Sequence, residues 1–201
     1  MTMSLWPDVK PEAARRLMHA AVQSFAAVGF HATTTRDIAT AAGMSPAALY
    51  VHFPSKTALL FEISRSGHEQ TLALVQDLAT GDGTPTDKMR ALVESFVAWH
   101  AREHTVARVV QYELDALPES EYLVVTGLRR RIEQAVRTLI AEGVRTGEFQ
   151  VPDEKTAARA VLSLGIDVAR WYTERARKTP RALGREYATL VLRMLGNSTI
   201  D

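Results

Sequence analysis

A short segment, residues 35–56, concentrates side chains that can donate hydrogen bonds to phosphate oxygens or base edges. Arg36 offers a planar guanidinium, which binds guanine through two parallel hydrogen bonds. Tyr50 and His52 each carry a donor that suits a phosphate oxygen. Lys56 lies where a helix is expected to begin, so a phosphate there would meet an ammonium and unpaired backbone N–H groups. The segment therefore has the chemistry to bind a polyanion.

Each of these residues also has a purely structural interpretation. Arg36 could pair with a nearby acid, and the aromatic bodies of Tyr50 and His52 could pack while their tips stay solvated. Thr35 and Ser45 can donate to phosphate as well, but their hydroxyls are also placed to cap helices. Capping alone is the stronger interpretation for those two, and both remain in the candidate set.

A second group, His100, Glu103 and His104, has the inverted zinc-peptidase spacing H-x-x-E-H. Two histidines four residues apart share a face of a continuous helix and can bind one metal ion. No further ligand or substrate-binding scaffold is evident, and short motifs often match by chance. A metal-binding α-helical hydrolase is therefore kept as the alternative, while we expect no metal, no cofactor and no enzyme activity.

The second half of the chain combines many aromatic residues with a few polar ones, as in a largely apolar ligand pocket. It also contains three consecutive arginines, residues 129–131, which fan around an expected helix so that one should face inward or toward a cleft. A guanidinium there can bind phosphate or carboxylate. The alternative is a solvated face paired with Glu121 or Glu133.

Short helices are expected to position the first group. Thr35 should cap one helix, which Gly43 ends in the left-handed conformation. Ser45 should cap the next helix, with Pro46 at its first position, and Pro54 ends that helix. Two helices joined by a tight glycine turn make a helix-turn-helix, whose second helix enters the DNA major groove.

The rest of the chain is also predicted to be helical, which gives an all-α fold of about nine helices without strands. An N-terminal three-helix domain, residues 1–54, should precede a larger helical bundle, residues 55–201. Thr86 is expected to cap the fifth helix. Other predicted helices span about residues 11–28, 55–79, 119–146, 153–175 and 180–195.

Composition narrows the possible functions. The chain has no Cys, which excludes disulfides, thiolate zinc sites and cysteine nucleophiles. It has no signal-peptide pattern and no apolar run of membrane-spanning length, so we expect a soluble cytoplasmic protein without a membrane partner. The net charge is only +1, but residues 1–56 hold five basic and three acidic residues. That asymmetry has the sign expected of a DNA-binding segment.

The N-terminal segment resembles that of TetR-family transcriptional regulators over about the first quarter of the chain. The matching positions are Phe25, Gly29, Phe30, Thr34, Thr35, Ile38, Ala39, Gly43, Ser45, Leu49, Tyr50, Phe53 and Lys56, followed by Leu59 or Leu60. The resemblance implies an obligate homodimer, an N-terminal DNA reader and a C-terminal domain that binds a small effector. It also places Ala47 in the DNA-binding set, as part of the recognition helix.

The recognition helix departs from the family pattern. The family often has Gly at the position of Ala47 and Thr or another side chain at that of Ala48. Both are alanine here, and Val51 precedes His52. Few polar side chains are left to read base edges, so the operator sequence does not follow from the resemblance.

The resemblance also favours dimerisation through the last two helices, as a four-helix bundle. Each of these helices carries an apolar stripe that could instead pack into its own core. The stripes are Ala157, Ala160, Val161, Leu164, Gly165 and Val168, then Leu183, Tyr187, Leu190, Val191, Met194 and Leu195.

Two segments, VVQYELDAL and VARWYTERARKTPRALGREY, are similar to effector domains of actinobacterial regulators of lipid and steroid catabolism. Those regulators respond to acyl-CoA thioesters. The helices that the family uses as pocket walls give the candidate effector residues: Phe96, Trp99, His100, Val110, Glu113, Tyr122, Arg129, Arg130 and Trp171.

Together these features predict a ligand-responsive repressor that binds a palindromic, double-stranded operator as a dimer. A small effector, for example an acyl-CoA thioester, would release it. Two other functions are kept open: the metal-binding hydrolase, and a helix-turn-helix protein that serves only as a protein-interaction module.

Overall fold

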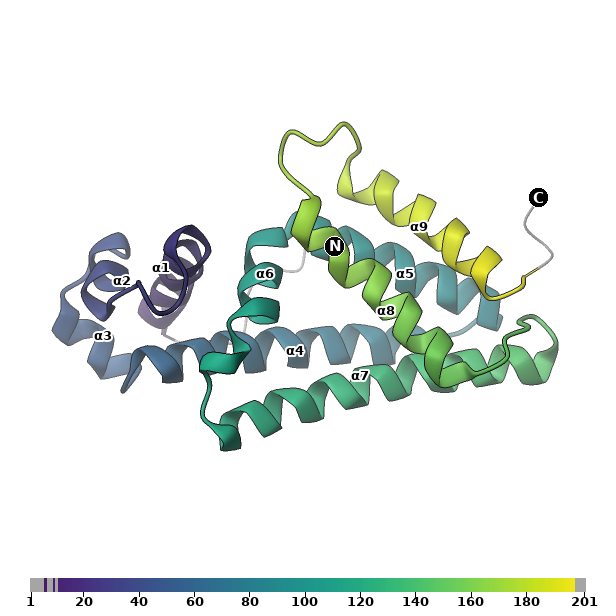
Figure 1. Ribbon diagram of the computed structural model, residues 1–201, viewed down its shortest axis with the longest axis horizontal. Coiled ribbons are helices and arrows are strands. Elements are labelled where there is room, and N and C mark those ends of the chain that lie inside the picture. Colours follow the sequence, from purple (N-terminus) through teal and green to yellow (C-terminus); the bar gives the residue numbers. More distant parts are fainter. Residues whose placement is uncertain (1–5, 7–8, 10, 198–201) are drawn as a thin grey trace. The chain divides into compact units, whose positions relative to one another are not determined.

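The computed structural model describes residues 6, 9 and 11–197, and in this part of the chain every regular element is a helix. The order is α1 (Glu12–Val28), α2 (Thr35–Ala41), α3 (Pro46–His52), α4 (Lys56–Thr80), α5 (Pro85–Arg102), α6 (His104–Tyr112), the 3-10 turn η1 (Leu114–Ala116), α7 (Glu119–Thr146), α8 (Glu154–Trp171) and α9 (Pro180–Met194) (Figure 1). The all-α prediction is confirmed. None of the described helices is long and apolar enough to cross a lipid bilayer.

The chain forms two compact units, each with its own core. The first comprises residues 1–69 and 105–126, and the second comprises residues 70–104 and 127–201. Helices α4 and α7 contribute residues to both units. The predicted functional division at residues 54 and 55 stays a prediction.

The core of the first unit explains why its short helices are stable. Neither α2 nor α3 is long enough to persist alone in water. Each places apolar side chains into a common core, where Ile38 of α2 and Leu49 of α3 are fully buried beside Leu17 and Phe25 of α1. Leu49 and Phe53 are therefore core residues, and α2 and α3 are held in place by packing.

In the second unit, α5 packs against both α8 and α9. The approach is close at two glycines. A Cβ on Gly184 of α9 would lie 2.5 Å from the Glu94 carbonyl oxygen of α5, and one on Gly165 of α8 would lie 2.5 Å from the Phe96 ring. These positions tolerate no side chain without displacing α5.

The apolar stripe predicted on α8 in fact covers two faces. Val161, Gly165 and Val168 are buried in the core of their own unit, whereas Leu164 is exposed. Gly165, a member of the stripe that the resemblance places at a dimer interface, instead contacts Phe96 and Val97 of α5 within its own subunit.

Two predicted helix caps are corrected by the same structural motif. Thr34, not Thr35, caps α2, and Thr84, not Thr86, caps α5. In each case an aspartate three residues later accepts from the backbone N–H of the threonine, while its own N–H donates to the threonine hydroxyl. This capping box satisfies two otherwise unpaired N–H groups, which decides the position of the helix start. Helix α8 also ends earlier than predicted, at Trp171.

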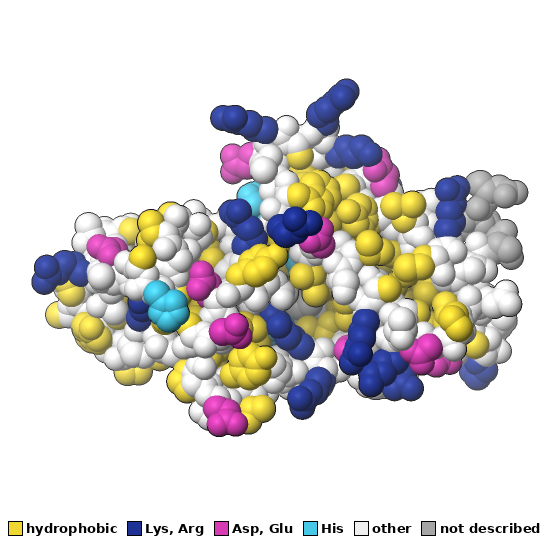
Figure 2. Space-filling model, viewed as in Figure 1, with side chains coloured by type: hydrophobic (Ala, Val, Ile, Leu, Met, Phe, Trp, Pro, Cys, Tyr) yellow, Lys and Arg dark blue, Asp and Glu magenta, His cyan; other side chains and the backbone are white. Residues whose placement is uncertain are grey.

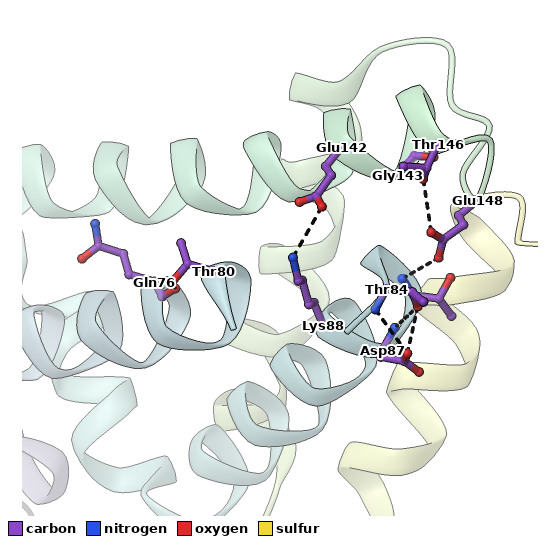
Figure 3. A network of polar contacts seen from close by, with 10 residues as sticks. Gln76, Thr80, Thr84, Asp87, Lys88, Glu142, Gly143, Thr146 and Glu148 are labelled. Atoms are coloured by element: carbon purple, nitrogen blue, oxygen red, sulfur yellow. Dashed lines mark hydrogen bonds and ion pairs between the residues drawn. The ribbon is translucent and has the colours of Figure 1, made fainter. Parts of the chain in front are cut away.

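A polar network joins the start of α5 to the end of α7 (Figure 3). The Glu148 carboxylate accepts from the Thr86 backbone N–H at 3.0 Å and from the Thr146 hydroxyl at 3.2 Å. Lys88 forms a long ion pair with Glu142, 3.4 Å from Nζ to Oε1. Asn197, just beyond α9, donates to the Thr86 hydroxyl at 2.7 Å. The loop at Glu148 thus ties three helix ends together.

Candidate nucleic-acid interface

The α2–turn–α3 segment has the backbone of a helix-turn-helix. Gly43 has φ +66°, the left-handed conformation that ends α2 and that glycine adopts without strain. The Ser45 hydroxyl accepts from the Ala48 N–H at 3.2 Å, and Pro46 occupies the first turn of α3. These local signals were legible in the sequence, and all three predictions are confirmed.

Helix α3 has one buried side and one solvent side. Leu49 is fully buried, while Ala47, Tyr50 and Val51 are exposed. Val51 is 79% exposed, far more than a core valine. Spacings of three and four residues put these three side chains on one helix face. Val51 was not among the predicted site residues. It lies two residues after the buried Leu49, and two residues are about half a turn of a helix, so this spacing could have shown that Val51 faces solvent.

A hydroxyl pair joins the two helices of the motif. The Tyr50 Oη lies 3.2 Å from the Thr35 Oγ1, at the start of α2. Because Thr34 caps α2, the Thr35 hydroxyl is available to Tyr50 and helps to fix its ring. The Tyr50 side chain is 53% exposed. His52, the last residue of α3, is half-buried.

Arg36 is exposed in the first turn of α2, where a cation is unfavourable to the helix dipole. Its side chain makes no hydrogen bond or ion pair with any residue that the structure describes. Hydrogen bonds from the Thr34 hydroxyl and backbone N–H lower the pKa of Asp37, and the charge of Arg36 adds a smaller effect in the same direction. Arg36 is thus a cation at the motif surface that is available to an anion.

Lys56 has a structural role that the sequence did not reveal. Its ammonium donates to the Phe30 and Thr33 carbonyl oxygens, each at 2.6 Å, and lies 4.2 Å from the centre of the Phe30 ring. Arg16 acts similarly, donating to the Ala42 carbonyl oxygen at the end of α2. Two of the cations counted as DNA-facing charge therefore bind backbone oxygens within the unit.

The histidine motif does not form the helical face that a metal site requires. Helix α5 ends at Arg102 and α6 begins at His104, so Glu103 lies in the break between them. His100 is buried, with Nδ1 2.8 Å from the Phe96 carbonyl oxygen, whereas Glu103 pairs with Arg102. Among the described residues, no group of three or more His, Cys, Asp or Glu side chains could hold a metal ion. The expectation that both histidines share one helix face was wrong.

Large apolar side chains remain exposed on α8 and α9. They are Leu164, Trp171, Leu190 and Met194, and Figure 2 shows hydrophobic side chains gathered over these two helices. The most exposed is Leu190, at 57%. The buried residues of the same helices, such as Val168 and Val191, face the core. The exposed four form a second surface, here called the α8–α9 surface.

Comparison with known proteins agrees with this architecture. Residues 17–63 match the family described as "Bacterial regulatory proteins, tetR family", and residues 82–195 match "Tetracyclin repressor-like, C-terminal domain". The chain belongs to the TetR family. It is 38% identical to a TetR-family regulatory protein of known structure from Rhodococcus RHA1, with a TM-score of 0.88, covering 94% of this chain and 100% of the other.

Two further similar proteins have descriptions that state an activity or a bound ligand. The HTH-type transcriptional repressor KstR2 of Mycolicibacterium smegmatis is 28% identical over 195 residues, covering 92% of this chain and 93% of that protein. AibR, whose structure was solved with isovaleryl coenzyme A and operator DNA, is 19% identical and has a TM-score of 0.79. The match covers 91% of this chain and 97% of AibR. The likeness to AibR shows a shared fold.

The candidate effector residues of this TetR-family chain fall in both units. Phe96, Trp99 and His100 are buried on α5, with the His100 ring 4.2 Å from that of Phe96 and 4.9 Å from that of Trp99. The other members in the second unit are Arg129, Arg130 and Trp171, and those in the first unit are Val110, Glu113 and Tyr122. Val110 is a core residue of its unit, while Arg130 and Trp171 are exposed. That they line one pocket stays a prediction.

Proposed function

We propose that this protein is a dimeric transcriptional repressor that binds a palindromic operator and is released by an anionic, largely apolar effector. The observation that carries the proposal is the solvent-facing side of α3. Buried Leu49 anchors this helix, Gly43 makes the turn before it and Ser45 caps its start. Such a helix fits the major groove, and a two-fold dimer presents two of them to successive turns of a palindrome. This activity places the protein in the cytoplasm, beside the chromosome.

The proposed DNA contacts differ in kind. Arg36 reads a base, because it is exposed and its guanidinium is uncommitted among the described residues. Tyr50 and His52 bind phosphates, with Thr35 positioning Tyr50. Ser45 and Ala47 lie at the start of α3, close to the groove.

Lys56 contributes to the DNA interface mainly by positioning it. Its ammonium is shared among the carbonyl oxygens of the loop between α1 and α2. A phosphate at the start of α4 would meet the positive charge of this ammonium and the positive end of the helix dipole.

The DNA proposal is tested by selecting operators from a random duplex library and measuring affinity at several salt concentrations. Arg36→Ala should weaken binding to the selected operator by roughly 5- to 150-fold and relax the preference at one position in each half-site. Arg175→Ala, which removes an exposed arginine between α8 and α9, is the matched control and should bind like wild type. If no duplex is retained at any salt concentration, the motif serves as a protein-interaction module instead.

Repression and its release are supported by relatives. KstR2 is named a transcriptional repressor, and AibR binds isovaleryl coenzyme A within the same fold. In this chain, an acyl group suits the aromatic residues of α5, and the phosphates of coenzyme A suit one of the arginines at 129–131. We therefore assign an acyl-CoA thioester as the effector class.

The effector proposal is tested by thermal shift and operator release with isovaleryl-CoA, palmitoyl-CoA, free coenzyme A and palmitate. An acyl-CoA should raise the melting temperature, because it binds the native state alone, and should release the operator at the same concentrations. Arg130→Ala should weaken both responses, whereas Arg137→Ala, an exposed arginine on the same helix, should not. A response to uncharged hydrophobic compounds but not to any acyl-CoA would contradict the anionic head group.

A further inference from the structure

The solvent face of α3 is almost entirely apolar. Ala47, Tyr50 and Val51 share this face, and Val51 alone presents two exposed methyl groups. The remaining exposed residue of the helix is Pro46, which also lacks a hydrogen-bonding side chain. A recognition helix of this composition offers almost nothing to pair with base donors and acceptors.

Two polar groups beside this face hydrogen-bond within the motif, and His52, half-buried at the end of α3, is assigned to a phosphate. The Tyr50 hydroxyl pairs with that of Thr35 at 3.2 Å, and the Ser45 hydroxyl accepts from the Ala48 N–H at 3.2 Å. Arg36, on α2, is the uncommitted side chain of the motif that can form a bidentate pair with a base. Apolar contact is therefore the chemistry that the exposed face of α3 offers most for sequence discrimination.

The major groove contains one apolar feature, the C5-methyl group of thymine. An exposed valine loses contact with water when such a methyl group covers it, whereas a base edge carrying only donors and acceptors would lose hydrogen bonds there. Contact between Val51 and a thymine methyl is thus the pairing that stabilises both surfaces.

We propose that Val51, with Ala47 beside it, reads thymine methyl groups in each operator half-site. The selected operators should then carry thymine, on either strand, at one or two fixed positions per half-site apart from the base read by Arg36. This inference rests on the proposed DNA-binding function, and it adds the base chemistry that α3 recognises.

The test replaces single thymines of the selected operator by uracil, which removes only the C5-methyl group. With the wild-type protein, uracil at the positions under Val51 should weaken binding about fourfold for each methyl group lost, as expected for about one buried methylene-sized contact. Val51→Ala should bind the thymine operator correspondingly less tightly and should no longer distinguish thymine from uracil at those positions.

Val28→Ala is the matched control, because Val28 is also an exposed valine of the first unit, at 61%, but lies at the end of α1. It should keep the full response to uracil. Melting temperatures of both variants should equal that of wild type, since neither side chain is buried.

The inference is overturned if wild type binds every uracil-substituted operator as tightly as the thymine operator, or if Val51→Ala keeps the full uracil response. In either result operator binding persists, so the proposed function stands while the thymine assignment fails. If the wild-type protein binds no duplex at all, both the proposed function and the thymine assignment are wrong.

Discussion

At the scale of single residues, the long cations divide between structure and function. Arg16 and Lys56 donate to backbone oxygens of their own unit, while Arg36 remains exposed without such a bond among the described residues. A carbonyl in a half-buried loop needs a donor as much as a phosphate does, because an unsatisfied acceptor costs free energy. The same residue type therefore has two roles within one small unit.

Lys56→Met should lower the stability of the protein, because it removes the ammonium but keeps most of the apolar stem over Phe30. Two loop carbonyls would lose their donor, and we expect a loss of about 1–3 kcal/mol in the free energy of unfolding. Thermal or urea unfolding measures it, with Arg36→Ala as the control that leaves stability unchanged. An unaltered melting temperature, together with a salt dependence of DNA binding reduced by about one unit, would show that the ammonium faces phosphate instead.

At the scale of elements, helix ends are determined by small groups of polar contacts. Both capping boxes consist of a threonine and an aspartate three residues later, at Thr34–Asp37 and Thr84–Asp87. The start of α5 gains a further acceptor from Glu148, which comes from the far end of α7. Hydrogen bonds from Thr86 lower the pKa of Glu148.

Glu148→Gln should lower the melting temperature at neutral pH by about 2–4 °C, as expected for the loss of roughly one capping interaction. Because the pKa of Glu148 is lower in the folded protein, its contribution is complete above the ordinary glutamate value of 4.5 and is lost as the pH falls through the folded value. The difference between wild type and variant should therefore narrow on acidification.

Glu142→Gln is the control for this pH dependence, since the contact of Glu142 within the described part of the chain is a long ion pair with Lys88. It should have a smaller effect at neutral pH. A Glu148→Gln variant whose deficit stays constant from pH 7 to pH 3 would show that the carboxylate charge has no part in holding α5.

At the scale of the whole molecule, we propose that the exposed half of α8 and α9 forms the dimer interface. The α8–α9 surface places Leu164, Trp171, Leu190 and Met194 in solvent, whereas the neighbouring glycines and valines fill the core. Exposed apolar patches of this kind mark protein interfaces. This division also identifies which substitutions test assembly and which test folding.

Leu190→Glu combined with Met194→Glu should convert a micromolar dimer to monomer, because a second copy would have to bury two uncompensated carboxylates. Analytical ultracentrifugation measures the conversion, and operator affinity should fall with it. Leu123→Glu, an exposed leucine in the first unit, is the matched control and should remain dimeric. A wild-type protein that sediments as a monomer at micromolar concentration would contradict the assignment.

Gly165→Leu tests a different property of the same helix. Its side chain would collide with Phe96 within one subunit, so it should destabilise the fold by about 1–3 kcal/mol rather than act at the interface. The unfolding free energy distinguishes the two effects.

The sequence by itself determined the helix-turn-helix, because its signals are local. A glycine that must be left-handed, a Ser-Pro helix start and an apolar residue at each buried position act within one or two turns of chain. The family signature uses the same positions and indicated the same fold class, while the bounds of the later helices followed from apolar periodicity and capping residues. The wrong assignment of the cap to Thr35 instead of Thr34 also concerned local sequence. The T-x-x-D motif formed by Thr34 and Asp37 indicates the correct cap.

Only the tertiary structure decided which partners distant residues meet. Lys56 reaches carbonyls 23 and 26 positions earlier, and Gly165 meets Phe96 of another helix. An apolar stripe indicates that a helix has a buried face, but it does not show how far around the helix the core extends. The type of a residue does not determine which distant residues it contacts, because those contacts depend on how the helices pack. The tertiary fold thus exposed Val51 and Leu190, and it placed a helix break between His100 and His104.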